Sequence, residues 1–277
     1  MGIFRPTVLR EFLESEGAKA LKGLSQNFLI DGNIIRKILR VAQISEEDTV
    51  IEIGPGPGAL TEGLLQCGAH VIAVELDRKF ASSLARLDTV DHRLTIFQED
   101  ALTIDLSKLF VKKSHIKLVS NLPYHLTTPL LERFLPLYPM LDSMTIMVQK
   151  EVAERLTAVP GTKHVSSLSF FVRLFSHPTY CFDVPANCFF PKPSVTSTVA
   201  HLQLHTPPVG IDTKLFETLL RTAFLKRRKM LRSSLKGIAS SEKLSAAFDK
   251  SHIDPTVRPE ELSMDQFIAL YHNLFSS

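Results

Sequence analysis

The sequence has no long apolar run. Its 277 residues contain no stretch near the roughly 18 consecutive apolar residues that are needed to span a membrane. Charged residues, among them Arg5, Arg10 and Glu11, stand where a secretory signal would have its apolar segment, and the acidic ones also argue against a mitochondrial presequence. We therefore expect neither a membrane span nor a targeting segment, and we expect a cytoplasmic protein.

Cysteine is scarce. Cys67, Cys181 and Cys188 are odd in number and form no C-x-x-C pair, so they indicate neither a disulfide framework nor a zinc ribbon. The only spacing typical of a metal site joins His201 to His205. That stretch alternates like a strand, in which residues four apart lie roughly 13 Å from each other. We expect no metal site.

Composition places the chain among globular proteins. Apolar residues make up 44% and charged residues 22%, and the length favours one main domain with an appendage. The net charge of +3 is too small to predict a polyanionic partner by itself. Its distribution is more informative, because the segment between Glu217 and Glu242 has no acidic residue. The basic residues of that segment are Arg221, Lys226, Arg227, Arg228, Lys229, Arg232 and Lys236.

Short β-branched runs alternate with helical segments from residue 50 to about 204, a pattern typical of parallel βαβ units. An apolar stripe that begins after Asp31, a suitable N-cap, predicts a further helix over 31–44. The sequence therefore predicts an α/β fold with a doubly wound sheet. The predicted strands are 49–53, 70–75, 94–97, 117–120 and 144–148, and the predicted helices are 59–66, 77–87, 127–134 and 150–156.

The end of the sheet and the end of the chain have different patterns. Strands predicted over 179–182 and 196–204 have no long helix between them, which favours an antiparallel hairpin with 189–195 as a surface loop. Two prolines and a glycine then punctuate 205–210, and the remainder indicates helices only. We therefore predict domains over 1–204 and 205–277, the second small and all-helical.

The basic segment lies in this second domain. Arg228, Arg232 and Lys236 recur at a spacing of four residues, which predicts one helix face, with apolar residues such as Leu231 and Leu235 pointing inward. Such a run is commonly a solvated face, but lysine and arginine also bind nucleic-acid phosphates without distinguishing the base sequence.

A glycine-rich loop over 51–58 directly follows the first predicted strand. Glycines at this place let a ligand approach the backbone, although similar turns also occur in NAD-dependent enzymes and in ordinary tight connections. The flanking Pro55 and Pro57 stiffen the loop, which disfavours a pyrophosphate cradle. Glu75 ends the next strand, where an acid can bind two ribose hydroxyls. The spacing therefore favours an adenosine without a pyrophosphate.

Asp100 follows the third predicted strand. Its carboxylate is suited to accept a hydrogen bond from an adenine amine, with Ala101 beside it for apolar contact, or to cap a helix. The succession of Gly54, Glu75 and Asp100 at consecutive strand ends favours the ligand-binding interpretation.

Residues Asn121 to Tyr124 follow the fourth predicted strand. An amine conjugated to an adenine ring is a poor nucleophile, so methyl transfer to it requires its lone pair to be localised and aimed. The Asn121 oxygen and a carbonyl of Leu122-Pro123 are suited to accept both amine hydrogens, and Tyr124 to stack on an extruded base. The alternative is a turn capped by asparagine with tyrosine in the core. The transfer needs no general base, since water can take the proton afterwards.

Six segments together resemble one family: L-S-Q-N-F-L over 24–29, E-I-G-P-G-P-G over 52–58, V-E-L-D over 74–77, D-A-L over 100–102, N-L-P-Y over 121–124 and F-F-P-K-P-S-V over 189–195. The chain resembles the ribosomal RNA adenine N6,N6-dimethyltransferases of the small-subunit type, relatives of the Erm methyltransferases. Leu122 favours this type, because Erm enzymes more often have isoleucine there. Ser25 departs from the usual glycine.

The resemblance implies a Rossmann-like class I methyltransferase sheet and S-adenosylmethionine as cofactor. It implies that Phe189 sandwiches the target base opposite Tyr124. With an RNA substrate implied, we expect the basic side chains to contact its phosphates, namely Arg221, Arg227, Arg228, Arg232 and Lys236. The implied cofactor site comprises Asn27, Leu29, Gly54, Gly56, Glu75, Asp100, Ala101 and Asn121.

The same resemblance implies a substrate and a partner. Two adjacent adenines in a hairpin loop of small-subunit rRNA would be dimethylated in a pre-30S particle, and we expect a monomer that uses neither membrane nor metal. An Erm-like enzyme acting on large-subunit RNA and a non-catalytic ribosome-assembly factor stay open as alternatives. An NAD-dependent oxidoreductase would leave Asn121 and Tyr124 without a role.

Overall fold

The computed structural model divides into two compact units. The first unit comprises Met1–Ala153 and His177–His205, and the second comprises Glu154–Ser176 and Thr206–Ser277. No sequence pattern predicted that Glu154–Ser176 would group with the C-terminal helices, and the domain boundary at 204/205 stays a prediction. The structure describes residues 2–15, 17, 27–88, 91–110, 116–226 and 229–275.

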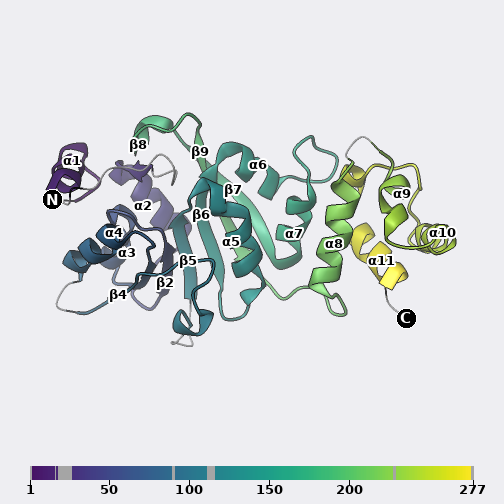
Figure 1. The fold of residues 1–277 in the computed structure, drawn as a ribbon, viewed down its shortest axis with the longest axis horizontal. Coiled ribbons are helices and arrows are strands. Elements are labelled where there is room, and N and C mark those ends of the chain that lie inside the picture. Colours follow the sequence, from purple (N-terminus) through teal and green to yellow (C-terminus); the bar gives the residue numbers. More distant parts are fainter. Residues whose placement is uncertain are drawn as a thin grey trace. The chain divides into compact units, whose positions relative to one another are not determined.

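A seven-stranded sheet in the order β4-β3-β2-β5-β6-β9-β7 forms the centre of the first unit (Figure 1). The strands from β4 to β6 are parallel, whereas β9 is antiparallel to β6, so the sheet is mixed. The predicted α/β fold is confirmed, and β9 and β7 are neighbours at one end of the sheet as expected. The strands are β2 (Thr49–Ile53), β3 (His70–Val74), β4 (Leu94–Phe97), β5 (Ile116–Asn121), β6 (Ser143–Gln149), β7 (Ser176–Val184) and β9 (Ser197–Leu204).

Helices connect and flank these strands (Figure 1). Asp31 caps α2 as predicted, because its carboxylate accepts hydrogen bonds from the backbone N–H groups of Asn33 and Ile34. Asp77 caps α4 in the same way. The helices of this unit are α1 (Pro6–Ser15), α2 (Gly32–Val41), α3 (Ala59–Gln66), α4 (Arg78–Leu84) followed by the 3-10 turn η2 (Ala85–Leu87), and α5 (Thr127–Phe134); α6 (Lys150–Thr157) begins here and ends in the second unit.

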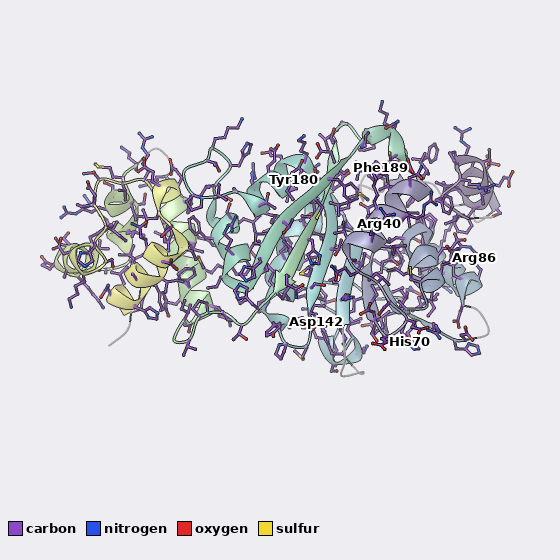
Figure 2. The ribbon with its side chains drawn as sticks, turned by 180° about the vertical axis from the view of Figure 1, so that it is seen from behind. Arg40, His70, Arg86, Asp142, Tyr180 and Phe189 are labelled. Atoms are coloured by element: carbon purple, nitrogen blue, oxygen red, sulfur yellow. The ribbon has the colours of Figure 1, made fainter. Side chains whose placement is uncertain are left out.

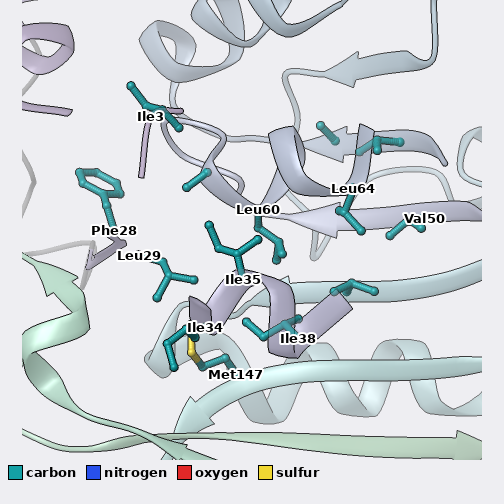
Figure 3. Packing of buried hydrophobic residues seen from close by; sticks show 14 of the residues in the cluster. Ile3, Phe28, Leu29, Ile34, Ile35, Ile38, Val50, Leu60, Leu64 and Met147 are labelled. Carbon is teal, nitrogen blue, oxygen red and sulfur yellow. The ribbon is translucent and has the colours of Figure 1, made fainter. Parts of the chain in front are cut away.

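One hydrophobic cluster of the first unit includes residues of α2, α3 and the sheet. Ile34, Ile35 and Ile38 form the buried face of α2 and lie in one cluster with Leu60 and Leu64 of α3 (Figure 3). Burying each such side chain contributes about 1.5–3 kcal/mol. This packing places the start of α3, and with it the glycine-rich loop, at a fixed position above β2.

A small two-stranded sheet joins β1 (Phe28–Leu29) to β8 (Phe189–Phe190) in antiparallel register. The prediction of a surface loop over 189–195 is therefore wrong at its first two residues. Phe190 pairs with Phe28 and Phe189 with Leu29; Phe28, Leu29 and Phe189 are buried, and Phe190 is partly buried. Backbone pairing between segments this far apart in the chain has no local sequence signal.

The second unit is built from helices around aromatic side chains. Phe170 lies with its ring centroid 4.6 Å from that of Phe267, and Phe216 packs edge-on against Tyr271. These contacts explain why the segment that contains Phe170 groups with the C-terminal helices. The helices are α7 (Ser167–Phe175), α8 (Thr213–Phe224), α9 (Leu231–Ser234), α10 (Ser241–Lys250) and α11 (Met264–Phe275), with a 3-10 turn, η7 (Leu235–Gly237), after α9.

Candidate functional site

We call the carboxyl ends of β2, β3, β4 and β5 the carboxyl edge of the sheet. An open cavity lies at this edge. The loops that follow these strands line it together with the segment around β1. The structure thus brings together every residue predicted for the cofactor site, although their roles stay predictions. Those residues are Asn27, Leu29, Gly54, Gly56, Glu75, Asp100, Ala101 and Asn121.

The glycine-rich loop has a backbone that only glycine adopts without strain. Gly54 and Gly56 have φ angles of 63° and 55°, in the left-handed region. A Cβ atom on Gly56 would also lie 3.0 Å from Cε1 of Phe28, closer than normal packing allows. The loop therefore presents bare backbone to the cavity, as the sequence predicted.

Glu75 is held in place by backbone donors. Its side chain is 6% exposed, and its two carboxylate oxygens accept hydrogen bonds from the N–H groups of Gly56 at 2.9 Å and Asp77 at 2.8 Å. Burial raises the pKa of Glu75, and these hydrogen bonds counteract that rise. Each carboxylate oxygen has a further lone pair for a hydroxyl donor.

Glu52 is a cavity residue to which the sequence analysis assigned no role. It is 2% exposed and accepts a hydrogen bond of 2.6 Å from the Thr61 hydroxyl. Burial raises its pKa to about 8, and the charge of Glu75 adds to the rise. Glu52 is therefore mainly protonated at neutral pH. Its place at the end of the first strand was readable from the sequence, but its desolvation was not.

Of the two roles that the sequence left open for Asp100, the structure shows the cap, and the contact with an adenine amine stays a prediction. One carboxylate oxygen accepts a hydrogen bond from the N–H of Leu102 at 2.8 Å and so caps the turn, which leaves the second oxygen as an acceptor. The adjacent Ala101 is buried in the cavity wall. Leu76, which the sequence analysis did not select, is 60% exposed and also lines the cavity.

The Asn121 side chain is oriented by the segment before β1. Its Nδ2 donates a hydrogen bond of 3.1 Å to the carbonyl of Asn27, so its Oδ1 is the atom left to accept a donor. The Pro123 carbonyl already accepts a hydrogen bond from Leu126 N–H at 2.9 Å. A carbonyl oxygen has two lone pairs, so this bond does not exclude Pro123, and the predicted acceptor stays a carbonyl of Leu122-Pro123.

The Tyr124 ring lies in the cavity wall and is anchored at its far end. Its hydroxyl is 2.7 Å from the hydroxyl of Ser197 on β9. Burial raises the pKa of Tyr124, so the phenol stays neutral. An anchored, neutral ring is suited to stack on a base without reorientation.

Phe189 is the predicted site residue that the structure does not bring to the cavity. Its side chain, labelled in Figure 2, is 3% exposed and belongs to the buried core cluster with Leu29. The lining of the cavity does not include it. Its role opposite Tyr124 stays a prediction that the described arrangement does not support.

The basic side chains that the structure describes are exposed: Arg221, Lys226, Lys229, Arg232 and Lys236. The predicted helix face is wrong, because α9 begins at Leu231 and gives way to a 3-10 turn at Leu235. An extended Met230 precedes α9, and a hydrogen bond of 2.8 Å from Leu231 N–H to the Val257 carbonyl anchors its start. The inward direction of Leu231 and Leu235 is confirmed. Arg227 and Arg228, like the family positions 24–26, lie outside the described residues.

No group of at least three histidine, cysteine, aspartate or glutamate side chains is arranged to hold a metal ion in the part of the chain that the structure describes. Among the helices of the same residues, none has the length and apolar character of a membrane span.

Comparison with known proteins places this geometry in a family. A family model described as ribosomal RNA adenine dimethylase matches residues 17–275. The chain is 46% identical over 281 residues to the ribosomal RNA small subunit methyltransferase A of Protochlamydia amoebophila strain UWE25, with 100% of this chain and 99% of the relative covered. The enzyme of the same name from Chlamydia muridarum is 44% identical, with 96% of each chain covered.

Two solved structures show the same fold. A dimethyladenosine transferase from Plasmodium falciparum superposes with a TM-score of 0.73 at 24% identity, covering 88% of this chain and 95% of the other. The 23S rRNA methyltransferase ErmE superposes with a TM-score of 0.68 at 23% identity, covering 90% and 99%.

Proposed function

The chain belongs to the ribosomal RNA adenine dimethylase family, and from that premise we propose the following activity. The protein transfers methyl groups from S-adenosylmethionine to the N6 amines of two adjacent adenines in a hairpin loop of small-subunit (16S) rRNA. The product is N6,N6-dimethyladenosine. The observation that carries the proposal is the Asn121 side-chain oxygen, next to the backbone of Leu122-Pro123 and the Tyr124 ring in one cavity wall.

The residues of the carboxyl edge fit S-adenosylmethionine by their donor and acceptor chemistry. Glu75 has lone pairs for ribose hydroxyls, and the second oxygen of Asp100 suits an adenine amine. Gly54 and Gly56 leave bare backbone beside them. When bound, the cofactor supplies an electrophilic methyl group on sulfur.

The protein's own side chains prepare the nucleophile. Asn121 Oδ1 and a carbonyl of Leu122-Pro123 accept the two hydrogens of the adenine amine, which favours a tetrahedral nitrogen with a localised lone pair. Extruding the base costs a few kcal/mol, and stacking on Tyr124 returns about 1–3 kcal/mol. The nitrogen loses its proton to water after transfer, so no side chain need act as a base.

The substrate class follows from the relatives, which are named as small-subunit rRNA methyltransferases. Bases in a hairpin loop are cheap to extrude because they are already partly unstacked. We place the reaction in a pre-30S particle in the cytoplasm, with the protein acting as a monomer and its exposed basic side chains contacting phosphates.

The test is incubation of the full chain with S-adenosylmethionine and small subunits that lack the modification, followed by mass spectrometry of the rRNA nucleosides. We expect N6,N6-dimethyladenosine at two adjacent positions, which corresponds to four methyl groups per rRNA molecule. Large subunits serve as the control. Monomethyladenosine alone, or methylation of the large-subunit RNA, would refute the proposed substrate.

A further inference from the structure

The segment from α4 to η2 supports the glycine-rich loop from outside the cavity. A Cβ atom on Gly58 would lie 2.6 Å from Leu87 Cδ1 and 2.8 Å from Leu84 Cδ2, so this segment is packed directly against the end of the loop. Phe80 of α4 also packs edge-on against Phe28, with ring centroids 5.3 Å apart. Since Phe28 lines the cavity, the segment braces two of its walls.

Arg86 makes the polar contact between this segment and the loop. One guanidinium nitrogen donates a hydrogen bond to the Pro57 carbonyl, and the other donates to the Ser83 carbonyl at 2.7 Å. The guanidinium also lies over the ring of Phe12, 4.5 Å from its centroid. Arg86, labelled in Figure 2, therefore joins η2, the loop and α1. Pro57 lines the cavity, whereas Arg86 and Phe12 do not.

The N-terminal helix presents Phe12 from a fixed position. Leu9 and Leu13 of α1 are buried in the core cluster. Just before the helix, the N–H of Ile3 donates a hydrogen bond of 3.0 Å to the carboxylate of Glu62 on α3. Just after it, Lys79 donates to the Gly17 carbonyl at 2.8 Å. Both contacts attach α1 to the two helices that flank the loop.

Holding the Pro57 carbonyl has a direct effect on the loop. The Pro57 oxygen and the Gly58 N–H belong to the same planar peptide group, so fixing the oxygen also fixes the N–H. That N–H donates a hydrogen bond of 3.0 Å to the Pro55 carbonyl and so closes the turn. Glycines lose more backbone conformational entropy than other residues when they become ordered. A loop that is ordered before the ligand binds loses less entropy on binding, which favours affinity. A charged donor on a backbone carbonyl is stronger than a neutral one.

We propose that Arg86 is a positioning residue for the methyl donor: by joining Phe12 to the Pro57 carbonyl, it holds the glycine-rich loop in the conformation that receives S-adenosylmethionine. Arg86 acts through the loop and does not touch the donor. The inference rests on the proposed function, because that function assigns S-adenosylmethionine to this cavity.

The test is calorimetric titration of S-adenosylmethionine into the full chain and its variants. We expect Arg86→Ala to raise Kd about three- to tenfold, because a charge-assisted hydrogen bond is lost, and to change kcat at saturating donor less than about twofold. Arg86→Lys should restore part of the affinity through its single charged donor. Phe12→Leu keeps an apolar side chain but removes the ring face that the Arg86 guanidinium contacts. The Kd of this variant for S-adenosylmethionine should therefore rise less than the Kd of Arg86→Ala.

A matched control lies at the other end of α3. Arg93 also donates from its guanidinium to a backbone carbonyl, that of Gly68, which does not line the cavity. Arg93→Ala should lower Tm as Arg86→Ala does but leave Kd unchanged. Circular dichroism verifies folding, and Arg86→Lys serves if the alanine variant fails to fold.

The outcomes separate this inference from the proposed function. Unchanged donor affinity in folded Arg86 variants, or equal losses in the Arg86 and Arg93 variants, would overturn the role of Arg86. A wild-type chain that binds the donor but does not methylate small subunits would refute the proposed substrate and leave the comparison of affinities valid. A wild-type chain that does not bind the donor would overturn both.

Discussion

At the carboxyl edge, hydrogen bonds to the backbone hold the polar side chains that face the cavity, as Glu75 and Asn121 show. In the basic segment, Arg232 and Lys236 are exposed on a short helix and the turn that follows it. We therefore expect methyl transfer at the carboxyl edge to depend on the position and desolvation of single atoms, and RNA binding by the basic segment to depend on charge. The rate of methyl transfer should be sensitive to single substitutions and independent of salt. The affinity for RNA should change little with single substitutions and fall as salt increases.

Asn121→Ala should have the largest effect. The substitution removes a preorganised acceptor for the adenine amine, and we expect methyl transfer to slow by about 10²- to 10³-fold at any salt concentration. Single-turnover transfer to small subunits measures this rate, and RNA affinity should stay unchanged. Asn33→Ala, on the exposed face of α2, is the matched control. If the Asn121 variant kept its rate but lost RNA affinity, the two regions would not be separable in this way.

Glu52 shows the consequence of burial for stability. Its carboxyl has a pKa of about 8 when folded and 4.5 as its ordinary value, so between these pH values the folded state binds the proton and the unfolded state does not. The contribution of Glu52 to the free energy of unfolding is therefore fully present below pH 4.5 and is lost as the pH rises through 8. Between pH 6 and pH 8 we expect the free energy of unfolding to decrease by about 2 kcal/mol from this group.

Glu52→Gln should remove that decrease, because the amide does not ionise. Urea unfolding at both pH values measures it. Glu47→Gln, at an exposed position, is the control and should keep the wild-type profile. An equal loss of stability in the wild type and the Glu52 variant would mean that the carboxyl is ionised in its buried position.

Single substitutions in the basic segment should have the smallest effects. Arg232→Ala and Lys236→Ala should each weaken binding to small-subunit RNA a few-fold and reduce the slope of log affinity against log salt by about 0.7–0.9. Arg221→Ala should do less, because Arg221 already forms an ion pair of 2.6 Å with Glu217. Filter binding over a salt series measures the slopes. If a double variant of Arg232 and Lys236 kept the wild-type slope, we would conclude that this segment does not contact the RNA.

Local sequence signals predicted most of the first unit. The strand over 49–53 and the helix over 59–66 were placed at their observed bounds, because glycine, proline and apolar periodicity mark these ends within a few residues. The same local order placed Gly54, Glu75, Asp100 and Asn121 at successive strand ends. Parallel strands bring such ends to one edge, so the cavity lining was predictable without distances.

Where the predictions differed from the structure, contacts between distant segments were responsible. Phe189 lies in a core cluster because β8 pairs with β1, a partner about 160 residues away that no local pattern specifies. The basic run has the spacing of a helix face, but Met230 and the bond from Leu231 to Val257 restrict α9 to 231–234. Tertiary contacts outweighed helix propensity at this place.

The sequence alone determined the α/β class, the order of the motifs at the strand ends and the family to which the chain belongs, since these depend on periodicity and on residue types at fixed spacings. Tertiary structure decided the rest: the pKa of Glu52, the orientation of the Asn121 side chain and the link from Arg86 to Pro57. Each of these depends on which atoms are desolvated or hydrogen-bonded by segments far away in the chain, and such neighbours exist only once the chain has folded.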